Sequence, residues 1–293
     1  MAVRGKSINL FLMDGEPSGR IKCTLANWTG IAYKIPRTAL ELCKERDDLR
    51  QSGIYFLFGT SDQTGNNVVY VGQAGARKNG EGLLYRLQEH KRNPDKDYWT
   101  EAVVFTTSNN SFGPTEISYL ENRFCGLAIA AKRYDVKNSN DPTHGNITEE
   151  KESELEEFVD YARIVMGTLG HKVFEPIVAS SPTTEVAAVS DDEPILYFNR
   201  TNLKATGRRT SEGFVVFKGS AVVSELQKSC PESVVKLRDR FKDKIDASHI
   251  LAEDILFTSP SAAAAFVGGS SLSGNELWKT ADGVSLKHLE KTE

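Results

Sequence analysis

The sequence predicts an α+β fold in two parts. Two short apolar runs, Gly53–Phe58 and Val68–Val71, flank a polar loop, which is typical of an antiparallel strand pair. From Leu83 onward the apolar residues instead recur at helical spacing. Residues 176–194 have no aromatic residue and are rich in Ser, Thr, Pro, Ala and acids, which is the composition of a linker. Further strands and helices follow it.

The elements before the first helix follow from local patterns. Ser7–Met13 and Lys22–Leu25 are predicted as strands around a turn at Asp14–Pro17. Pro36–Arg50 is predicted as a helix, because a few apolar residues stand among charged ones. Beyond the helix that starts at Leu83, Trp99–Thr107 is predicted as a further strand.

Two more helices should precede the linker. Gly113-Pro114 is a good helix start, because proline suits the first helical turn. Thr148–Met166 is predicted as the next helix, and its acidic start is favoured by the helix dipole. Between them, Tyr134–Lys137 is expected to form a short terminal strand.

The residues after the linker predict a second small α+β domain. Ile195–Asn199 and Gly213–Lys218 are predicted strands, and a helix is expected from Pro231 to Lys242. Ser259-Pro260 supplies an N-cap and a first-turn proline for a compact alanine helix.

Charge distribution is more informative than the net charge of −4. Residues 1–148 hold 19 Lys and Arg against 16 Asp and Glu, whereas residues 149–190 hold 3 against 9. The small positive excess therefore lies where a nucleic-acid backbone would need it. The slightly acidic total argues against a polybasic, histone-like binder.

The cysteines and the hydropathy pattern limit the cellular context. The four cysteines are scattered without metal-ligand spacing, which argues against a zinc site. Isolated thiols favour a reducing compartment, so we expect a cytoplasmic location. No apolar stretch approaches the roughly 20 residues of a membrane span, so no membrane partner is expected. The oligomeric state stays open.

Five short features occur in a characteristic order. Gly53-Ile54-Tyr55 opens one predicted strand and Tyr70-Val71-Gly72 closes the next, followed by Arg86, His90 and Glu121 on two helices. Over about residues 51–140 this order resembles the GIY-YIG nuclease family. The resemblance implies a small three-stranded antiparallel sheet flanked by helices, and an endonuclease that hydrolyses phosphodiester bonds in DNA.

The resemblance also implies the roles of the site residues. Tyr55 would help to deprotonate the attacking water and Tyr70 would line the same pocket. Arg86 would hold the scissile phosphate and Glu121 would bind Mg²⁺ or Mn²⁺. Asn138 would orient the site; Asn140 is the alternative, and Asn138 is preferred because it directly follows the predicted strand Tyr134–Lys137. These roles agree with general chemistry, because a guanidinium stabilises phosphorane charge and a lone carboxylate leaves Mg²⁺ its water and phosphate ligands.

Two neighbours of these residues, His90 and Gln73, leave questions about the site open. His90 follows Arg86 by four residues, so it shares its helix face, and it is either a surface residue or part of the site. A tyrosine is a poor base unless positive charge lowers its pKa, so we expect Arg86, a metal ion and His90 to lower that of Tyr55. Gln73 stands where many family members have lysine.

Basic residues surround the first helix. Their ordinary interpretation is solvated surface charge, but their place beside the motif residues favours phosphate contacts. The residues predicted to bind nucleic acid are Arg77, Lys78, Lys91 and Arg92.

The C-terminal half resembles a second family. Three segments, 213–220, 254–264 and the region of Trp278-Lys279, resemble the DUF4357 domain, which often follows GIY-YIG regions and suggests DNA recognition. Ser273-Gly274 replaces its usual Asn-Gly. Considered singly, the alanines and Trp278 are expected to be core residues.

The predicted organisation has four parts: a leader segment (1–50), a GIY-YIG nuclease domain (51–175), a linker (176–194) and a DUF4357-like DNA-recognition domain (195–293). One alternative is a nucleic-acid binding protein with a vestigial nuclease site. A second is an interaction protein that uses the nuclease fold only as a scaffold.

Overall fold

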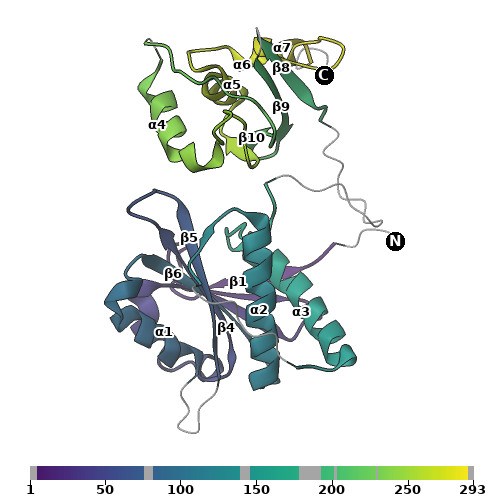
Figure 1. Ribbon diagram of the computed structural model, residues 1–293. Helices are drawn as coiled ribbons and strands as arrows, with labels where there is room; N and C mark the ends of the chain where they lie inside the picture. Colours follow the sequence, from purple (N-terminus) through teal and green to yellow (C-terminus); the bar gives the residue numbers. More distant parts are fainter. Residues whose placement is uncertain are drawn as a thin grey trace. The chain divides into compact units, whose positions relative to one another are not determined.

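The chain folds into two compact units, one ending at Pro176 and the other starting at Ile177. The structure, a computed structural model, describes residues 5–75, 82–138, 146–177, 193–200, 203–228 and 230–289. The division falls at the start of the predicted linker, whose residues 178–192 lie outside the described part. Each unit combines a sheet with helices, so the α+β class is confirmed (Figure 1).

A seven-stranded sheet forms the centre of the N-terminal unit, in the order β1-β2-β3-β6-β4-β5-β7. Its strands are β1 (Ile8–Leu12), β2 (Ile21–Leu25), β3 (Gly30–Pro36), β4 (Gly53–Thr60), β5 (Asn67–Ala74), β6 (Trp99–Thr107) and β7 (Asp135–Val136). Neighbouring strands are antiparallel, except that β5 and β7 are parallel.

The expectation of a three-stranded sheet is therefore wrong. The three expected strands are β4, β5 and β6, and they pair as predicted. The predicted leader segment 1–50 adds β1, β2 and β3 to the same sheet, because β3 pairs along the free edge of β6 from Gly30 to Pro36.

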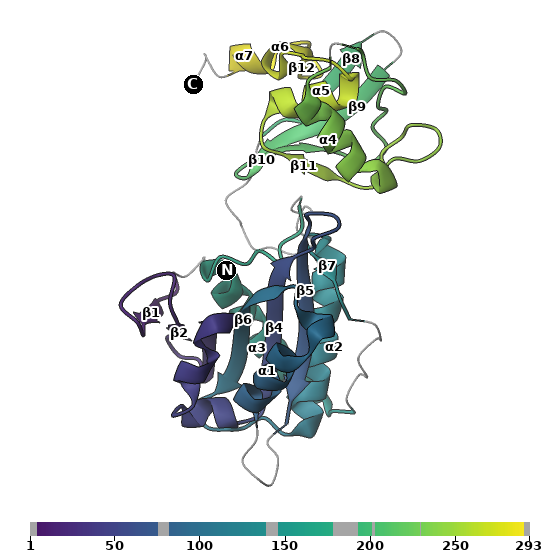
Figure 2. The same cartoon turned by 90° about the vertical axis from the view of Figure 1, so that its left-hand side faces the viewer.

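Helices cover both faces of this sheet. The helical elements are η1 (Arg37–Cys43), η2 (Asp47–Arg50), α1 (Leu83–Arg92), η3 (Pro94–Lys96), α2 (Pro114–Ala131) and α3 (Glu149–Thr168). Helix α1 lies on one face, while α2 and α3 lie on the other (Figure 2). No helix in the described ranges is long and apolar enough to cross a membrane.

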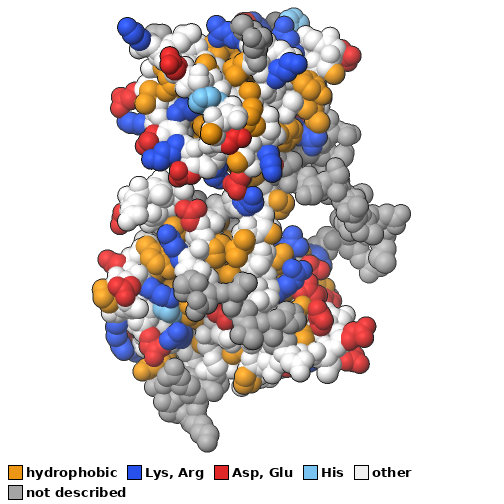
Figure 3. All heavy atoms as spheres, in the orientation of Figure 1, with side chains coloured by type: hydrophobic (Ala, Val, Ile, Leu, Met, Phe, Trp, Pro, Cys, Tyr) orange, Lys and Arg blue, Asp and Glu red, His pale blue; other side chains and the backbone are white. Residues whose placement is uncertain are grey.

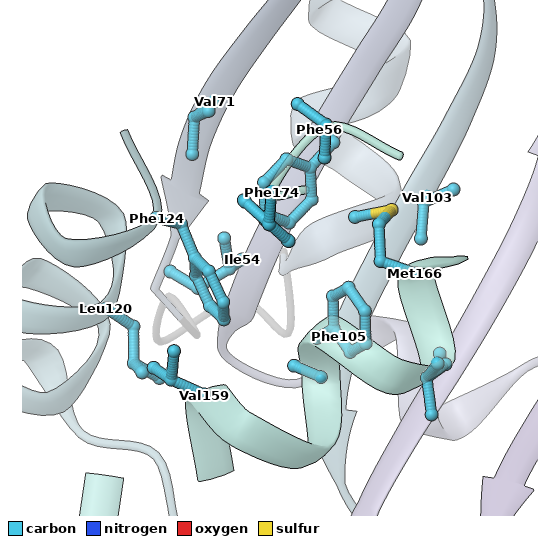
Figure 4. Close-up of a cluster of buried hydrophobic side chains, with 14 of the residues drawn as sticks. Ile54, Phe56, Val71, Val103, Phe105, Leu120, Phe124, Val159, Met166 and Phe174 are labelled. Atoms are coloured by element: carbon cyan, nitrogen blue, oxygen red, sulfur yellow. The ribbon is translucent and has the colours of Figure 1, made fainter. Parts of the chain in front are cut away.

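Strand alternation separates two buried clusters. Ile54 and Phe56 point toward α2 and α3, where they pack with Phe124 and Met166 (Figure 4). Tyr55, between them in the chain, points to the opposite face, toward α1. This alternation puts the first motif tyrosine on the face that carries the candidate site.

Two segments differ from their prediction. Pro36–Arg50 forms two short 3₁₀ helices, not one α-helix, because only Leu40 and Cys43, three residues apart, are buried in η1 while Leu42 is exposed. Strand β3 was not predicted. It lies between two strands and is buried on both faces, so it lacks the alternation of a half-exposed strand.

The C-terminal unit has a five-stranded antiparallel sheet in the order β11-β10-β9-β8-β12. Its strands are β8 (Leu196–Arg200), β9 (Leu203–Thr210), β10 (Gly213–Val216), β11 (Ile255–Phe257) and β12 (Trp278–Lys279). Its helical elements are α4 (Glu232–Arg240), η4 (Lys242–Lys244), α5 (Pro260–Gly268), α6 (Gly274–Leu277) and α7 (Leu286–Leu289). Trp278 and the alanines of α5 lie in its hydrophobic core.

Candidate active site

Strands β4 and β5 bring the two motif tyrosines to one face of the sheet. Tyr55 lies opposite Gly72 in the antiparallel register, and Tyr70 lies opposite Leu57, two residues along. Residues related in this way share a face, and the two phenol rings have centroids 6.2 Å apart. Tyr55 is only 1% exposed, whereas Tyr70 is partly buried. Tyr70 is therefore the tyrosine nearer to solvent.

The glycine of the second motif makes room for the first tyrosine. A Cβ atom on Gly72 would lie 2.3 Å from both Cζ and Oη of Tyr55. That separation is far inside ordinary van der Waals contact, about 3.5–4.0 Å between carbon atoms. The ring of Tyr55 thus lies across the backbone of Gly72, and only glycine at position 72 leaves room for it.

Helix α1 places His90 against both tyrosines. Leu83, Leu87 and His90 follow helical spacing and form the buried face of the helix. The Nε2 atom of His90 lies 2.6 Å from the hydroxyl oxygen of Tyr55. Its ring centroid is 5.2 Å from that of Tyr55 and 5.5 Å from that of Tyr70. The structure therefore brings His90 to the tyrosines and not to the helix surface.

Arg86 lies one turn before His90, at the edge of the same face. Its Nη1 atom donates a hydrogen bond of 2.7 Å to Oε2 of Glu89, and its side chain is 41% exposed. Burial raises the pKa of Tyr55 and of Tyr70, and the positive charge of Arg86 opposes both rises. The guanidinium is thus close to the phenols and is also accessible from solvent.

Burial decides the protonation states in the cluster. It raises the pKa of the Tyr55 hydroxyl well above its usual value, and the neighbouring Tyr70 adds to that rise. It lowers the pKa of His90 to about 4, with Lys96 and Arg86 contributing. Of the three groups that the sequence predicted to lower the pKa of Tyr55, Arg86 acts in that direction, but desolvation outweighs its guanidinium. At neutral pH the phenol and the imidazole are both uncharged.

Glu121 lies on α2, which packs on the other face of the sheet, but its carboxylate acts electrostatically on both tyrosines. Burial raises its pKa, while hydrogen bonding from Gln73 and the charge of Arg86 oppose that rise. The carboxylate also acts on Tyr70, whose pKa is raised first by burial and then by Glu121. Gln73, the departure from the family pattern, therefore lies beside the predicted metal ligand.

The chemistry of Glu121 fits a metal site with a single protein carboxylate. Among the residues described, no three His, Cys, Asp or Glu side chains gather to hold a metal ion. A divalent cation here would keep most of its coordination positions for water and phosphate oxygens, as Mg²⁺ prefers. A partly buried carboxylate with a raised pKa also gains from added positive charge. Glu121 is thus the residue that would hold Mg²⁺ or Mn²⁺.

Asn138 holds the strand that carries Tyr70. Its side-chain carbonyl accepts a hydrogen bond of 3.0 Å from the N–H of Val71, and its side-chain amide donates one of 2.8 Å to the carbonyl of Val71. The resemblance predicts that Asn138 orients the site. In the structure, Asn138 binds the backbone of β5 at Val71, one residue from Tyr70, so it would orient Tyr70 through the strand.

The structure describes two of the four basic residues predicted to bind nucleic acid. Lys91 and Arg92 form the end of α1, where Lys91 is partly buried and Arg92 is exposed. Arg77 and Lys78 belong to residues 76–81, which lie outside the described part.

Lys96 lies in the site although the sequence did not predict it there. Its Nζ atom is 3.2 Å from the centroid of the Tyr70 ring. Burial lowers the pKa of Lys96 to about 8, and the charge of Arg86 adds to this effect. The feature of the sequence that could have indicated this position is the turn sequence Asn93-Pro94-Asp95, directly after α1. There the Asn93 side chain accepts a hydrogen bond of 2.9 Å from the backbone of Asp95 in a turn.

Comparison with known proteins identifies one part of the chain. Residues 196–290 match the domain of unknown function DUF4357, so the second resemblance is confirmed. No model of the GIY-YIG family matches, and the interpretation of residues 51–140 rests on the motifs and on the geometry above. No curated protein and no solved structure matches the chain.

Proposed function

We propose that the protein is a metal-dependent endonuclease that hydrolyses phosphodiester bonds in DNA. The single observation that carries the proposal is the 2.6 Å contact between the Tyr55 hydroxyl and Nε2 of His90. It lies in a cluster that also contains Arg86 and Glu121. Hydrolysis of a phosphodiester needs a proton acceptor, a cation at the phosphate and a metal ligand, and these residues supply them.

The proposed proton route runs through two residues. Tyr55 alone is a weak base, because burial raises its pKa and keeps the phenol protonated. As the attacking water gives a proton to the Tyr55 oxygen, the phenol proton passes to Nε2 of His90. This step requires a neutral imidazole, and the lowered pKa of His90 ensures that state at neutral pH.

Arg86 and Glu121 would act on the phosphate. Arg86 would exchange its hydrogen bond with Glu89 for bonds to the nonbridging oxygens, where negative charge grows during attack. A divalent ion bound at Glu121 would supply Lewis-acid stabilisation of the phosphate and leaving group. Gln73 would keep the carboxylate in place.

The charged surfaces agree with this arrangement. Acidic side chains gather over α3, whose exposed residues include Glu149, Glu150 and Glu154 (Figure 3). DNA is expected to avoid that surface because of charge repulsion. The DUF4357 domain is proposed to recognise DNA, so that cleavage and recognition belong to different units.

Substitution of Glu121 tests the proposal. The wild-type protein should cut plasmid, single-stranded or branched DNA with Mg²⁺ and not with a chelator. Glu121→Ala should abolish cleavage while DNA binding and the unfolding transition are retained. Glu154→Ala is the matched control, because it removes a carboxylate that is 65% exposed and pairs with Lys151 on the surface.

Two outcomes would contradict the assignment. Full cleavage by Glu121→Ala, or by the wild type in excess chelator, would show that Glu121 holds no essential metal. A wild-type protein that binds DNA but cuts none of the three substrates would favour the vestigial-site alternative.

A further inference from the structure

The sheet of the C-terminal unit has one face that the described helices leave uncovered. Helices α4 and α5 lie on the same side of it (Figures 1 and 2). The core under them uses Leu196, Phe198 and Ala205 from β8 and β9, and Phe214 from β10. The residues that alternate with these in each strand belong to no hydrophobic cluster among the described residues. They form the outer face of the sheet, which is exposed at Tyr197, Lys204 and Lys279, whereas Val215 on β10 is fully buried.

The strand register places the outer-face residues side by side. Lys279 on β12 pairs with Tyr197 on β8, which pairs with Thr206 on β9. Lys204 and Arg208 stand two residues to either side of Thr206, on the central strand of the sheet. A rise of about 3.3 Å per residue separates these two cations by about 13 Å, and two strand spacings put Lys279 about 10 Å from β9.

The charge of this face has one sign. The outer-face positions of β8, β9, β10, β11 and β12 include Lys204, Arg208 and Lys279 but no Asp or Glu. Tyr197 is 37% exposed in their midst. Three cations spaced by about 10–13 Å would contact three separate phosphates of a DNA backbone, since each strand carries one phosphate per about 3.4 Å of helix axis.

The three cations of this face form no ion pair with the described residues of the C-terminal unit. Among the described residues, the Nε atom of Arg208 is buried without a hydrogen-bond partner, and Lys204 and Lys279 form no ion pair. The charged residues on the helical side differ, since Lys236 pairs with Glu232 and Lys287 pairs with Glu276. The exposed ammonium groups of Lys204 and Lys279 are therefore available to phosphate oxygens, whereas the buried Nε–H of Arg208 becomes available only when its side chain moves outward.

We propose that this outer face, centred on β9, is a DNA-binding surface that contacts phosphates through Lys204, Arg208 and Lys279. Tyr197 would add an aromatic contact to a sugar or base beside them. The inference rests on the proposed function for its partner. It assigns the contact to the sheet and not to the helices α4 and α5.

A salt titration of DNA binding by the full chain tests this surface. Binding of a labelled DNA duplex is measured by fluorescence anisotropy in chelator, which prevents cleavage. The test variant replaces all three cations by glutamine, as Lys204→Gln, Arg208→Gln and Lys279→Gln. The control removes the same charge from the helical side, as Lys236→Gln, Lys242→Gln and Lys287→Gln. Circular dichroism and thermal unfolding check that both variants fold.

The expected result is a change in the salt dependence. Each phosphate contact contributes about 0.9 to the slope of log affinity against log salt, so losing three should reduce that slope by about 2.7. The control should keep the wild-type slope and affinity. If the triple variant unfolds, Lys204→Glu and Lys279→Glu, at two exposed positions, should still weaken binding at least tenfold.

The possible failures are distinguishable. If the wild type binds and cuts DNA while the folded test variant keeps the wild-type slope, this surface is wrong and the proposed function stands. If the wild type binds no DNA at low salt, the proposed function fails and this inference fails with it.

Discussion

Replacement of Gly72 by alanine should displace the Tyr55 ring and destabilise the N-terminal unit. The added Cβ would lie 2.3 Å from Cζ and Oη of Tyr55, more than 1 Å inside an ordinary contact of about 3.5 Å. The ring cannot move away freely, because it is 1% exposed and its hydroxyl contacts His90. Overpacking of this kind costs about 1–3 kcal/mol, and loss of the Tyr55–His90 hydrogen bond adds about 1 kcal/mol. The free energy of unfolding should therefore fall by about 2–4 kcal/mol.

Urea denaturation measures this change, and a second glycine provides a control of opposite sign. Gly126 is exposed in the middle of α2, and a Cβ there would meet no atom within 4 Å. Gly126→Ala should stabilise the N-terminal unit by about 0.5–1 kcal/mol, because alanine loses less backbone entropy in a helix. Tryptophan fluorescence reports this unit through Trp28 and through Trp99, which is fully buried in the cluster that contains Tyr55, whereas Trp278 reports the C-terminal unit.

One result would refute the packing argument. If Gly72→Ala changes the unfolding free energy by less than about 0.5 kcal/mol, the range of ordinary surface substitutions, the Tyr55 ring does not lie across this backbone. Cleavage provides a second readout. If the proposed function is right, single-turnover cleavage at saturating DNA should also slow in Gly72→Ala and not in Gly126→Ala.

Three further predictions concern His90, Lys96 and Arg86, which surround the two tyrosines. The pKa of His90 falls from 6.5 to about 4 on folding, so its contribution to stability is complete above pH 6.5 and is lost as the pH falls toward 4, by about 3 kcal/mol. His90→Gln should flatten that part of the unfolding profile, and an unchanged profile would contradict the shift. Lys96→Met should raise the pKa of His90 in an NMR titration while Lys96→Arg should not, because the charge of Lys96 helps to lower it. Equal titrations in both variants would argue against this coupling. Arg86→Ala should slow single-turnover cleavage by about 10²–10³ with little change in affinity, whereas Lys91→Ala should lower the salt slope of binding by about one unit. Normal cleavage by bound Arg86→Ala would make Arg86 a positioning contact.

Much of the local structure was predictable because its signals are short in range. The apolar runs at Gly53–Phe58 and Val68–Val71 predicted the β4–β5 pair, and the helical spacing from Leu83 predicted α1. The same periods predicted that Arg86 and His90 share a helix face. The predicted helix Pro36–Arg50 failed because a segment with so few buried residues carries little periodic signal.

The position of the site residues depended on contacts that no local pattern contains. Lys96 contacts Tyr70 across a turn, and Asn138 pairs with the backbone of Val71 from 67 residues away. The outer face of the C-terminal sheet emerges only from the strand register, since β9 has polar residues that resemble a loop when considered alone.

The sequence by itself determined the order of the motifs, the α+β class and the presence of the DUF4357 domain, because these depend on residue identity and short periods. Only the tertiary structure decided how large the first sheet is and which protonation states its site has. Strand β3 joins the sheet through backbone hydrogen bonds to β6. Such pairing does not depend on the identity of the side chains, so the sequence does not specify the partner strand. The raised pKa of Tyr55 arises from desolvation, which depends on every group packed around the phenol and on no single neighbour in the chain.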